Sequence, residues 1–450
     1  MNTKEISESF ASEILDKARK KGATAGDLLL VEGGHFSGQV RMAQIDKITE
    51  AHEKHLGLRL FFEKRSATTS TSDLSPDSLD RLIEDTCDLA RATAYDDFSG
   101  LPEEVSLEPL PPLDLYDPKG QDLSVEDKID LAIQTEAAAF ETDSRITNSE
   151  GAEFSNSHSH IVYANTLGFT GSYRTSAFIL SVSPIATQNG SMQRDSWYSY
   201  RRKFDEMDSP KVVGQIAAQR ALRRIGGRKI ATCQVPVIFD PETASTLLHN
   251  LFVALSGYSI YKGASFLAGR LGQKIAPDLF TLVDDGRIPR GLGSKPFDGE
   301  GLPTRRTVVV EQGVLQSYLL DTYSARKLQL RSTGNASRGI GDPPSVSPTN
   351  LHLSPGSFSP EEIIRSVQSG LYVTDLIGFG FNPITGDYSR GAVGLWIENG
   401  ELTYPVEEIT IAGNLRDILM QIERVGNDLK LDRKISSPTL QIARMTVAGH

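Results

Sequence analysis

The histidines are the first side chains to examine for chemistry, because an imidazole nitrogen can ligate a metal or move a proton near neutral pH. His52, Glu53 and His55 resemble a helical zinc motif, but their spacing is one residue shorter than HExxH. They also fall between predicted strands, so we interpret them as a solvated connector. His158 and His160 alternate and would share one face of a strand. Because no third ligand is evident, we interpret them as a surface pair.

Motifs that would indicate nucleotide binding or a serine hydrolase do not occur. The sequence has no GxxxxGK[ST] loop, no GxGxxG after a strand and no GxSxG elbow. Its two cysteines, Cys87 and Cys233, are too few for a disulfide framework or a cysteine-based zinc site. Lys and Arg number 47 against 58 Asp and Glu, and the net charge of -11 opposes binding to nucleic acid or to an anionic membrane.

Two polar segments, 332–339 and 386–392, stand out as candidate ligand-contacting regions. Both gather small, hydroxyl-bearing and charged residues between hydrophobic runs, where a backbone can approach a ligand closely. Two glycine-rich turns without a binding role are the alternative interpretation. The candidate side chains are Asp387, Tyr388, Ser389 and Arg390 in one segment and Thr333, Asn335 and Arg338 in the other.

The elements that must position these segments begin with a mixed N-terminal half. An apolar run at 27–31 and alternation at 39–41 and 57–61 predict a small antiparallel sheet. Ser75, followed by a proline and an aspartate, predicts the start of one helix, and Ser124 predicts the cap of another. This half therefore reads as α+β.

The rest of the chain is richer in predicted strands. Residues 145–199 predict short strands joined by Ser, Thr and Gly turns, and a helix at 209–225 ends at the pair Gly226-Gly227. Hairpins are predicted around residues 311–313 and at Asn399-Gly400. We expect an α+β protein with two domains: an N-terminal domain with an antiparallel sheet at 1–226, and a mostly β, barrel-like C-terminal domain at 227–450.

The sequence shows no membrane or secretion signal. No run of about 18 apolar residues occurs, so no membrane-spanning helix is predicted. The stretch 1–21 is polar and charged and lacks the apolar region of a signal peptide. We expect a cytoplasmic protein.

At the two polar segments the sequence closely resembles the TldD/PmbA family, whose members were historically labelled modulators of DNA gyrase. The resemblance spans nearly the whole chain, and its C-terminal strings are long and specific. The matching strings are 325–327, 332–336, 386–392, 396–400, 409–415 and 426–429, with 255–257, 265–267 and 297–301 upstream and 57–59 and 90–93 in the N-terminal half.

The family has two arms, and the resemblance places this chain in the non-catalytic one. TldD-type subunits carry HExxxH on a helix and a C-terminal cysteine that completes a zinc site, whereas TldE (PmbA)-type subunits lack these groups. The corresponding positions here are His249, Asn250 and Ala254, and the tail 437–450 contains no cysteine. An amide cannot act as the general base, and a methyl group cannot ligate zinc. We interpret His249 as a hydrogen-bonded packing residue, with a vestigial metal ligand as the alternative.

The resemblance implies a function in a pair of subunits. It implies a TldE-like chain that forms a heterodimer with a TldD-like zinc metallopeptidase acting on unfolded or extended peptides. This chain would hold no cofactor, and the zinc would lie in the partner. The peptide would bind by strand addition in a chamber, and the seven side chains of the two polar segments are the candidates for lining it.

Two other functions stay open at this stage. One is a stand-alone homodimer that binds peptides or regulates a topoisomerase-like partner without proteolysis. The other is an autonomous hydrolase that uses His158, His160 and nearby acids such as Glu153. Direct binding to nucleic acid is disfavoured by the charge and by the lack of a recognisable basic helix motif.

Overall fold

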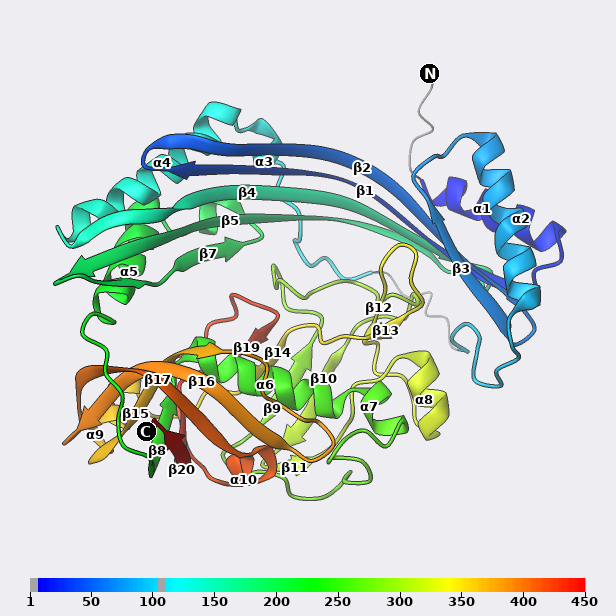
Figure 1. Ribbon diagram of the computed structural model, residues 1–450. Helices are drawn as coiled ribbons and strands as arrows, with labels where there is room; N and C mark the ends of the chain where they lie inside the picture. The colour runs from blue at the N-terminus through cyan, green and yellow to red at the C-terminus, as the bar shows by residue number, and fades with distance from the viewer. Residues whose placement is uncertain (1–6, 104–109, 450) are drawn as a thin grey trace.

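A long, curved antiparallel sheet arches over a second, β-rich body in the computed structural model of the protein, which describes residues 7–103 and 110–449 (Figure 1). The sheet has the strand order β3-β2-β1-β4-β5-β6, and β7 also pairs with β5. Its strands are β1 (Ala25–Arg41), β2 (Gln44–Phe62), β3 (Arg65–Thr71), β4 (Ile146–Asn165), β5 (Thr170–Gln188), β6 (Ser191–Arg194) and β7 (Trp197–Arg201).

The strands are much longer than the sequence pattern predicted. The expected pieces at 27–31 and 39–41 belong to one strand, and the expected short strands of 145–199 include β4 and β5, with 20 and 19 residues. The interpretation of His52 and His55 as a connector is wrong, because both lie within β2. In β1 the less buried residues lie mid-strand, and in β2 the N-terminal part is exposed, so local alternation marked only the buried parts of these strands.

Two helix layers explain where the apolar ends are. Helices α1 (Glu8–Lys20) and α2 (Pro76–Ala92) cover one end of the sheet, and α4 (Val125–Thr142) and α5 (Pro210–Leu222) cover the other, with the short α3 (Lys119–Asp122) between them (Figure 1). The first pair packs on a cluster that includes Leu28, Leu30, Leu56 and Leu58, and the second on one that includes Phe36, Phe154 and Phe178.

Both helices begin after the predicted serines, but only one of these serines caps its helix with a side-chain hydrogen bond. The Ser124 hydroxyl accepts a hydrogen bond from the Asp127 backbone N–H at 3.0 Å in a complete capping box. Ser75 precedes α2 as expected, but its side chain makes no cap bond. Asp73 instead accepts hydrogen bonds from the Ser75 backbone N–H and the Ser78 hydroxyl.

The C-terminal body is built on a closed β-barrel. Its strand order is β17-β16-β15-β8-β20-β18, and pairing of β17 with β20 closes it. The strands are β8 (Cys233–Phe239), β15 (Ser369–Ile377), β16 (Asp387–Glu398), β17 (Glu401–Asn414), β18 (Ile422–Val425) and β20 (Leu440–Ala448). The predicted α+β class with a barrel-like C-terminal part is confirmed. The division between residues 226 and 227 stays a prediction.

Smaller sheets and helices complete this body. One sheet contains β9 (Leu282–Asp285), β10 (Arg306–Glu311), β11 (Val314–Leu315), β14 (Leu351–Leu353) and β19 (Ile435–Ser436), and β12 (Ala336–Ser337) pairs with β13 (Ser345–Val346). The helices are α6 (Pro241–Leu255), α7 (Gly257–Tyr261), α8 (Thr322–Leu328), α9 (Pro360–Arg365) and α10 (Leu415–Met420); a 3-10 turn, Phe204–Glu206, precedes α5. None of the helices within the described ranges is long and apolar enough to cross a membrane.

Both predicted hairpins are present. Asn399 and Gly400 join β16 to β17 with φ values of 52° and 79°. Gln312 and Gly313 join β10 to β11 with φ values of 46° and 79°. Two consecutive positive φ angles are what a type I′ turn requires, and this turn matches the twist of the strands it joins.

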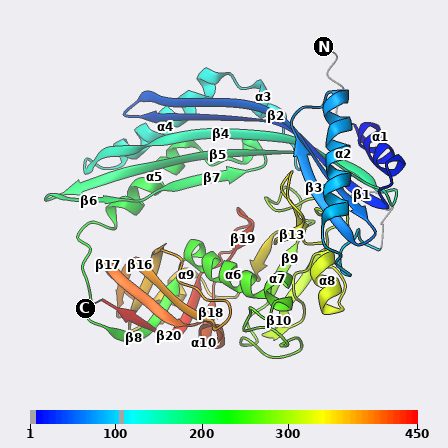
Figure 2. The same cartoon turned by 45° about the vertical axis from the view of Figure 1, so that its right-hand side comes forward.

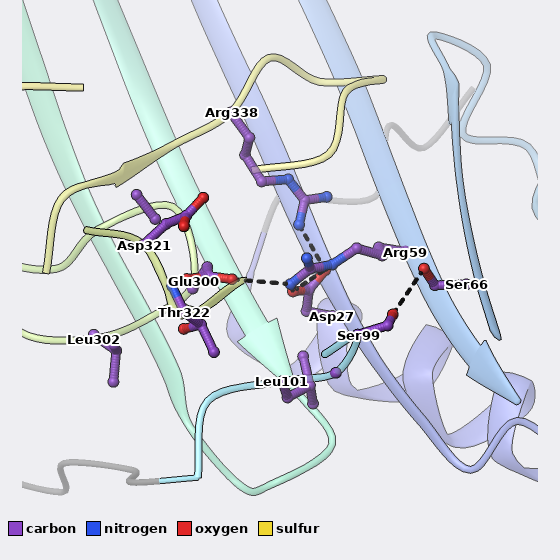
Figure 3. A network of polar contacts seen from close by, with 12 residues as sticks. Asp27, Arg59, Ser66, Ser99, Leu101, Glu300, Leu302, Asp321, Thr322 and Arg338 are labelled. Carbon is purple, nitrogen blue, oxygen red and sulfur yellow. Dashed lines mark hydrogen bonds and ion pairs between the residues drawn. The ribbon is translucent and has the colours of Figure 1, made fainter. Parts of the chain in front are cut away.

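A buried ionic network joins the sheet to the C-terminal body (Figure 3). Asp27 of β1 is fully buried and pairs with Arg59 of β2. Its other carboxylate oxygen accepts a hydrogen bond at 2.6 Å from Nη1 of Arg338, which follows β12. Although burial alone would raise the pKa of Asp27, the guanidinium groups of Arg338 and Arg59 hold it below its ordinary value. One carboxylate therefore holds two cations from opposite halves.

The two halves approach closely beside this network. A Cβ atom on Gly57 would lie 1.8 Å from the carbonyl oxygen of Ile340, so only glycine fits there. The hydroxyl of Tyr163 lies 2.9 Å from the carbonyl oxygen of Glu300. Burial raises the pKa of Glu300 from 4.5 to about 7; Asp298 and Asp321 add to the rise, and Arg59 opposes it.

Replacing Asp27 should destabilise the whole chain. The change Asp27→Asn leaves Arg338 buried without its counter-ion and Arg59 with only Glu300, 3.9 Å away, which we expect to cost about 3–5 kcal/mol of unfolding free energy. Urea denaturation monitored by circular dichroism measures it. Asp278→Asn is the control, because it breaks an exposed pair with Lys274 and should leave the midpoint almost unchanged. Equal midpoints for the two variants would refute the role of the network.

The Glu300 carboxyl should make stability depend on pH. Its raised pKa means that the folded chain binds this proton more tightly than the unfolded chain does. Stability should therefore fall as the pH rises from 4.5 to about 7. Glu300→Gln removes the titration, so its unfolding free energy relative to the wild type should increase over that window and then level off. A difference that does not change with pH contradicts the assignment.

Candidate functional site

Helix α6 carries the residues at the degenerate zinc positions, and the core of the C-terminal body holds it in place. Asp240 caps it by accepting hydrogen bonds from the backbone N–H and the hydroxyl of Thr243, both at 2.8 Å, and Pro241 follows the cap. Figures 1 and 2 show α6 on the side of this body that faces the long sheet. Its buried apolar residues are Ala244, Leu247, Leu248, Leu251, Ala254 and Leu255.

The residues that correspond to HExxxH do not converge on a common point. Ala254 is 0% exposed within the core, whereas His249 is exposed. The His249 ring lies 6.3 Å from the ring of Phe252, and within the described residues its nitrogens form no hydrogen bond. The interpretation of His249 as a hydrogen-bonded packing residue is therefore wrong. Partial burial lowers the pKa of His249, and the nearby cation of Arg390 lowers it further.

A hollow of about 510 Å³ lies beside this part of α6. One wall is formed by α6, and the opposite wall by the β15–β16 loop, Arg390 of β16 and Ile435 of β19. The lining residues are Ser245, Thr246, His249, Asn250 and Val253 of α6 with Phe379, Gly380, Phe381 and Pro383 of the loop. We call it the α6 hollow.

Strand alternation separates the four candidates of the second polar segment. Tyr388 is 1% exposed, and Arg390, on the same strand face, lines the α6 hollow. Asp387 and Ser389 are exposed. Asp387 accepts hydrogen bonds from the Thr385 hydroxyl at 2.6 Å and from Asn414 Nδ2 at 3.2 Å, which ties the turn together. The structure thus brings Arg390 together with His249 and Asn250.

The candidates of the first polar segment make internal contacts instead. The Thr333 hydroxyl accepts a hydrogen bond from the Leu320 backbone N–H at 2.7 Å, and Asn335 Nδ2 donates to Asp284 at 2.7 Å. Arg338 is held by Asp27, and its side chain is 0% exposed. This placement differs from the expectation that Thr333, Asn335 and Arg338 line a chamber, because their polar groups are used to hold the fold.

The histidine pair of β4 does not form a hydrolytic site with Glu153. His158 and His160 lie on one face of the strand and Glu153 on the other, where it accepts a hydrogen bond from the Ser37 hydroxyl at 2.7 Å. The His158 ring lies over the sheet 6.4 Å from that of His52. Glu153 is therefore not part of such a site, and Glu32, which lies opposite His160 on β1, pairs with His52 and Lys54.

The residues at the degenerate positions do not fit zinc. An amide at 250 and a methyl group at 254 leave one imidazole, and a single ligand does not hold zinc. In the part of the chain that the structure describes, no group of three or more His, Cys, Asp or Glu side chains is arranged to hold a metal. No reaction step through a metal follows from this chain's own residues.

Sequence reasoning missed two features near these sites. A cavity of about 830 Å³ lies between the halves, lined by residues of β3, the 94–100 segment, α7 and α8, and Glu300. The side chain of Phe379, beside the α6 hollow, is fully exposed. The alternation of glycine and phenylalanine at 378–381 could have indicated the exposed Phe379 from the sequence. The cavity depends on the docking of the halves and left no local pattern.

Comparisons with known proteins agree along the whole chain. Models of the PmbA/TldA metallopeptidase domain 1, central domain and C-terminal domain match residues 26–90, 118–225 and 232–449. The metalloprotease PmbA of Escherichia coli O157:H7 is 36% identical over 447 residues, covering 99% of this chain and 97% of the relative. A metalloprotease TldD homolog of Buchnera aphidicola (subspecies Acyrthosiphon pisum) is 24% identical over 476 residues, covering 100% of this chain and 98% of the relative.

Solved structures show the same fold. A Bacteroides thetaiotaomicron protein named as a modulator of DNA gyrase superposes with a TM-score of 0.91 at 29% identity, covering 98% of this chain and 99% of that one. TldE from Thermococcus kodakarensis superposes with a TM-score of 0.89 at 22% identity, covering 97% of this chain and 99% of that one, and this likeness concerns the fold alone.

The isolated chain should not retain zinc. After incubation with excess zinc and dialysis, elemental analysis should find far less than one zinc per chain, because His249 has no co-ligands on α6. The variant His249→Ala serves as the control and should give the same zinc content as the wild type. Stoichiometric zinc that disappears in His249→Ala would contradict this assignment.

Proposed function

The chain belongs to the PmbA/TldD metallopeptidase family, and we propose that it is the non-catalytic, TldE-like subunit of a heterodimer whose TldD-like partner carries the zinc. The observation that carries this proposal is the chemistry of α6. Asn250 and Ala254 stand where a zinc peptidase of this kind needs a carboxylate base and a second imidazole. The fold is retained while the catalytic groups are replaced.

Sequence similarity supports the same arm of the family. The chain is 36% identical to a PmbA and 24% identical to a TldD homolog, over nearly its full length in both cases. Because both arms occur within one family, a paralogous chain of the same fold is the natural partner. The peptidase active site of the pair would then belong to the partner.

The proposed role of this chain is to complete a chamber that admits extended peptides. Strand β3 supports it, because among the described strands β3 pairs only with β2 and so presents an unpaired edge. Residues 66–68 of that edge also line the 830 Å³ cavity between the halves. A peptide added along such an edge is held by backbone hydrogen bonds, which bind extended chains with little sequence preference.

Affinity purification from the native host tests the proposal. We expect a stoichiometric partner that carries HExxxH, one zinc per pair, and turnover of an unfolded protein substrate only by the pair. This chain alone should show no turnover, because Asn250 and Ala254 stand in place of a base and a zinc ligand. The same purification with a chain truncated after residue 226 controls for non-specific recovery.

Two outcomes would overturn this function. Recovery of the chain only with itself and without metal would favour a homodimeric peptide-binding or gyrase-modulating protein, as the name of the Bacteroides thetaiotaomicron structure suggests for that protein. Metal-dependent turnover by the isolated chain would show a catalytic site on this chain.

A further inference from the structure

We propose that the α6 hollow binds a carboxylate that is attached to an apolar group, such as the C-terminal residue of a peptide. The hollow lies at the position of the lost zinc motif, but its side chains are suited to an anion. The peptide as the source of the carboxylate rests on the proposed function. The carboxylate site itself does not.

The charge of the hollow is the first argument. Arg390 is half-buried, and its Nη2 donates to the carbonyl oxygen of Leu376 at 3.3 Å. No carboxylate within the described residues forms an ion pair with it, and no lining residue of the hollow is acidic. A partly desolvated guanidinium without a counter-ion is costly, and a bound anion removes that cost.

Unused hydrogen-bond donors are the second argument. Arg390 Nε, Asn250 Nδ2 and the Tyr388 hydroxyl are buried and have no hydrogen-bond partner among the described atoms. Buried polar groups in folded proteins are paired with few exceptions, so the two unpaired donors that belong to lining residues, Arg390 Nε and Asn250 Nδ2, indicate a missing acceptor. A carboxylate only accepts hydrogen bonds and offers about four lone pairs, which suits such a set.

The protonation states agree with this use. Burial raises the pKa of Tyr388, against the opposing cation of Arg390, so the hydroxyl keeps its proton at neutral pH. Burial and Arg390 lower the pKa of His249, so its ring is neutral there. The permanent positive charge of the hollow therefore comes from Arg390.

The apolar walls indicate the rest of the ligand. Val253 of α6, Phe381 and Pro383 of the loop, and Ile435 of β19 line the hollow beside the donors. Phe379, also in the lining, is fully exposed and would be covered by a bound ligand. A volume of about 510 Å³ exceeds that of a bare inorganic anion and lies in the range of small-molecule pockets. A ligand with a carboxylate and an apolar side chain would contact both the donors and the apolar lining residues.

Calorimetric titration of the isolated, zinc-free chain tests the proposal. The probes are N-acetylleucine, its C-terminal amide and inorganic phosphate. We expect heat of binding from the free acid and none from the amide, which has the same apolar group without the charge. Phosphate should bind more weakly than the acid, because it leaves the apolar wall uncovered.

Variants locate the site. Arg390→Gln should weaken binding of the acid by a factor of about ten or more, as expected for loss of a charge-assisted hydrogen bond. Asn250→Ala should weaken binding of the acid to a smaller extent, and it replaces Arg390→Gln in the test if that variant does not fold. Arg365→Gln is the matched control, because it removes the same charge from an exposed position at the end of α9 and should not change the affinity.

Each other result would overturn the inference. Equal binding of acid and amide would exclude the carboxylate, and so would binding that Arg390→Gln and Asn250→Ala do not change. Phosphate binding without binding of the acid would identify an inorganic oxyanion as the ligand instead. Because the isolated chain is used, a negative result leaves the paired peptidase standing, and absence of a partner would not alter these titrations.

Discussion

The buried carboxylate of Asp27 is the interaction on which the arrangement of the two halves depends. It holds Arg59 from its own sheet and Arg338 from the C-terminal body, and all three side chains are almost completely removed from solvent. A charge buried in this way is tolerated only while its partners stay in place. The network therefore favours a single relative placement of the sheet and the barrel, and Gly57 allows their backbones to come together beside it.

The relative placement of the two halves forms the cavity between them and sets which side of α6 faces the sheet. The cavity between the halves exists because β3 and the 94–100 segment lie opposite α7 and α8. Helix α6 faces the long sheet while its apolar side is fixed in the barrel-side core. The peptide-binding edge and the ligand site proposed above would both rely on a scaffold joined at Asp27.

Some of the buried polar groups beside α6 have no partner within the described residues. Asn250 and Arg390 both line the α6 hollow, and the Asn250 Nδ2 and Arg390 Nε donors are buried without a hydrogen-bond partner among the described atoms. Unpaired buried donors cost stability, and native proteins tend to keep such groups where they are used. The carboxylate proposed for the hollow would supply the missing acceptor.

Local residue patterns by themselves predicted the α+β class, the Ser124 cap and the two hairpins, because each depends on neighbours within a few residues. They also brought Arg390 into consideration. The mismatch at 249–254 came from the resemblance to the family. Only the tertiary structure decided that Thr333, Asn335 and Arg338 are structural, that Glu153 lies across the sheet from His158, and that β1 and β2 continue through their polar middles. The physical reason is that burial and partner choice depend on contacts between residues far apart in the chain, and Asp27 and Arg338, separated by 311 positions, are the clearest case.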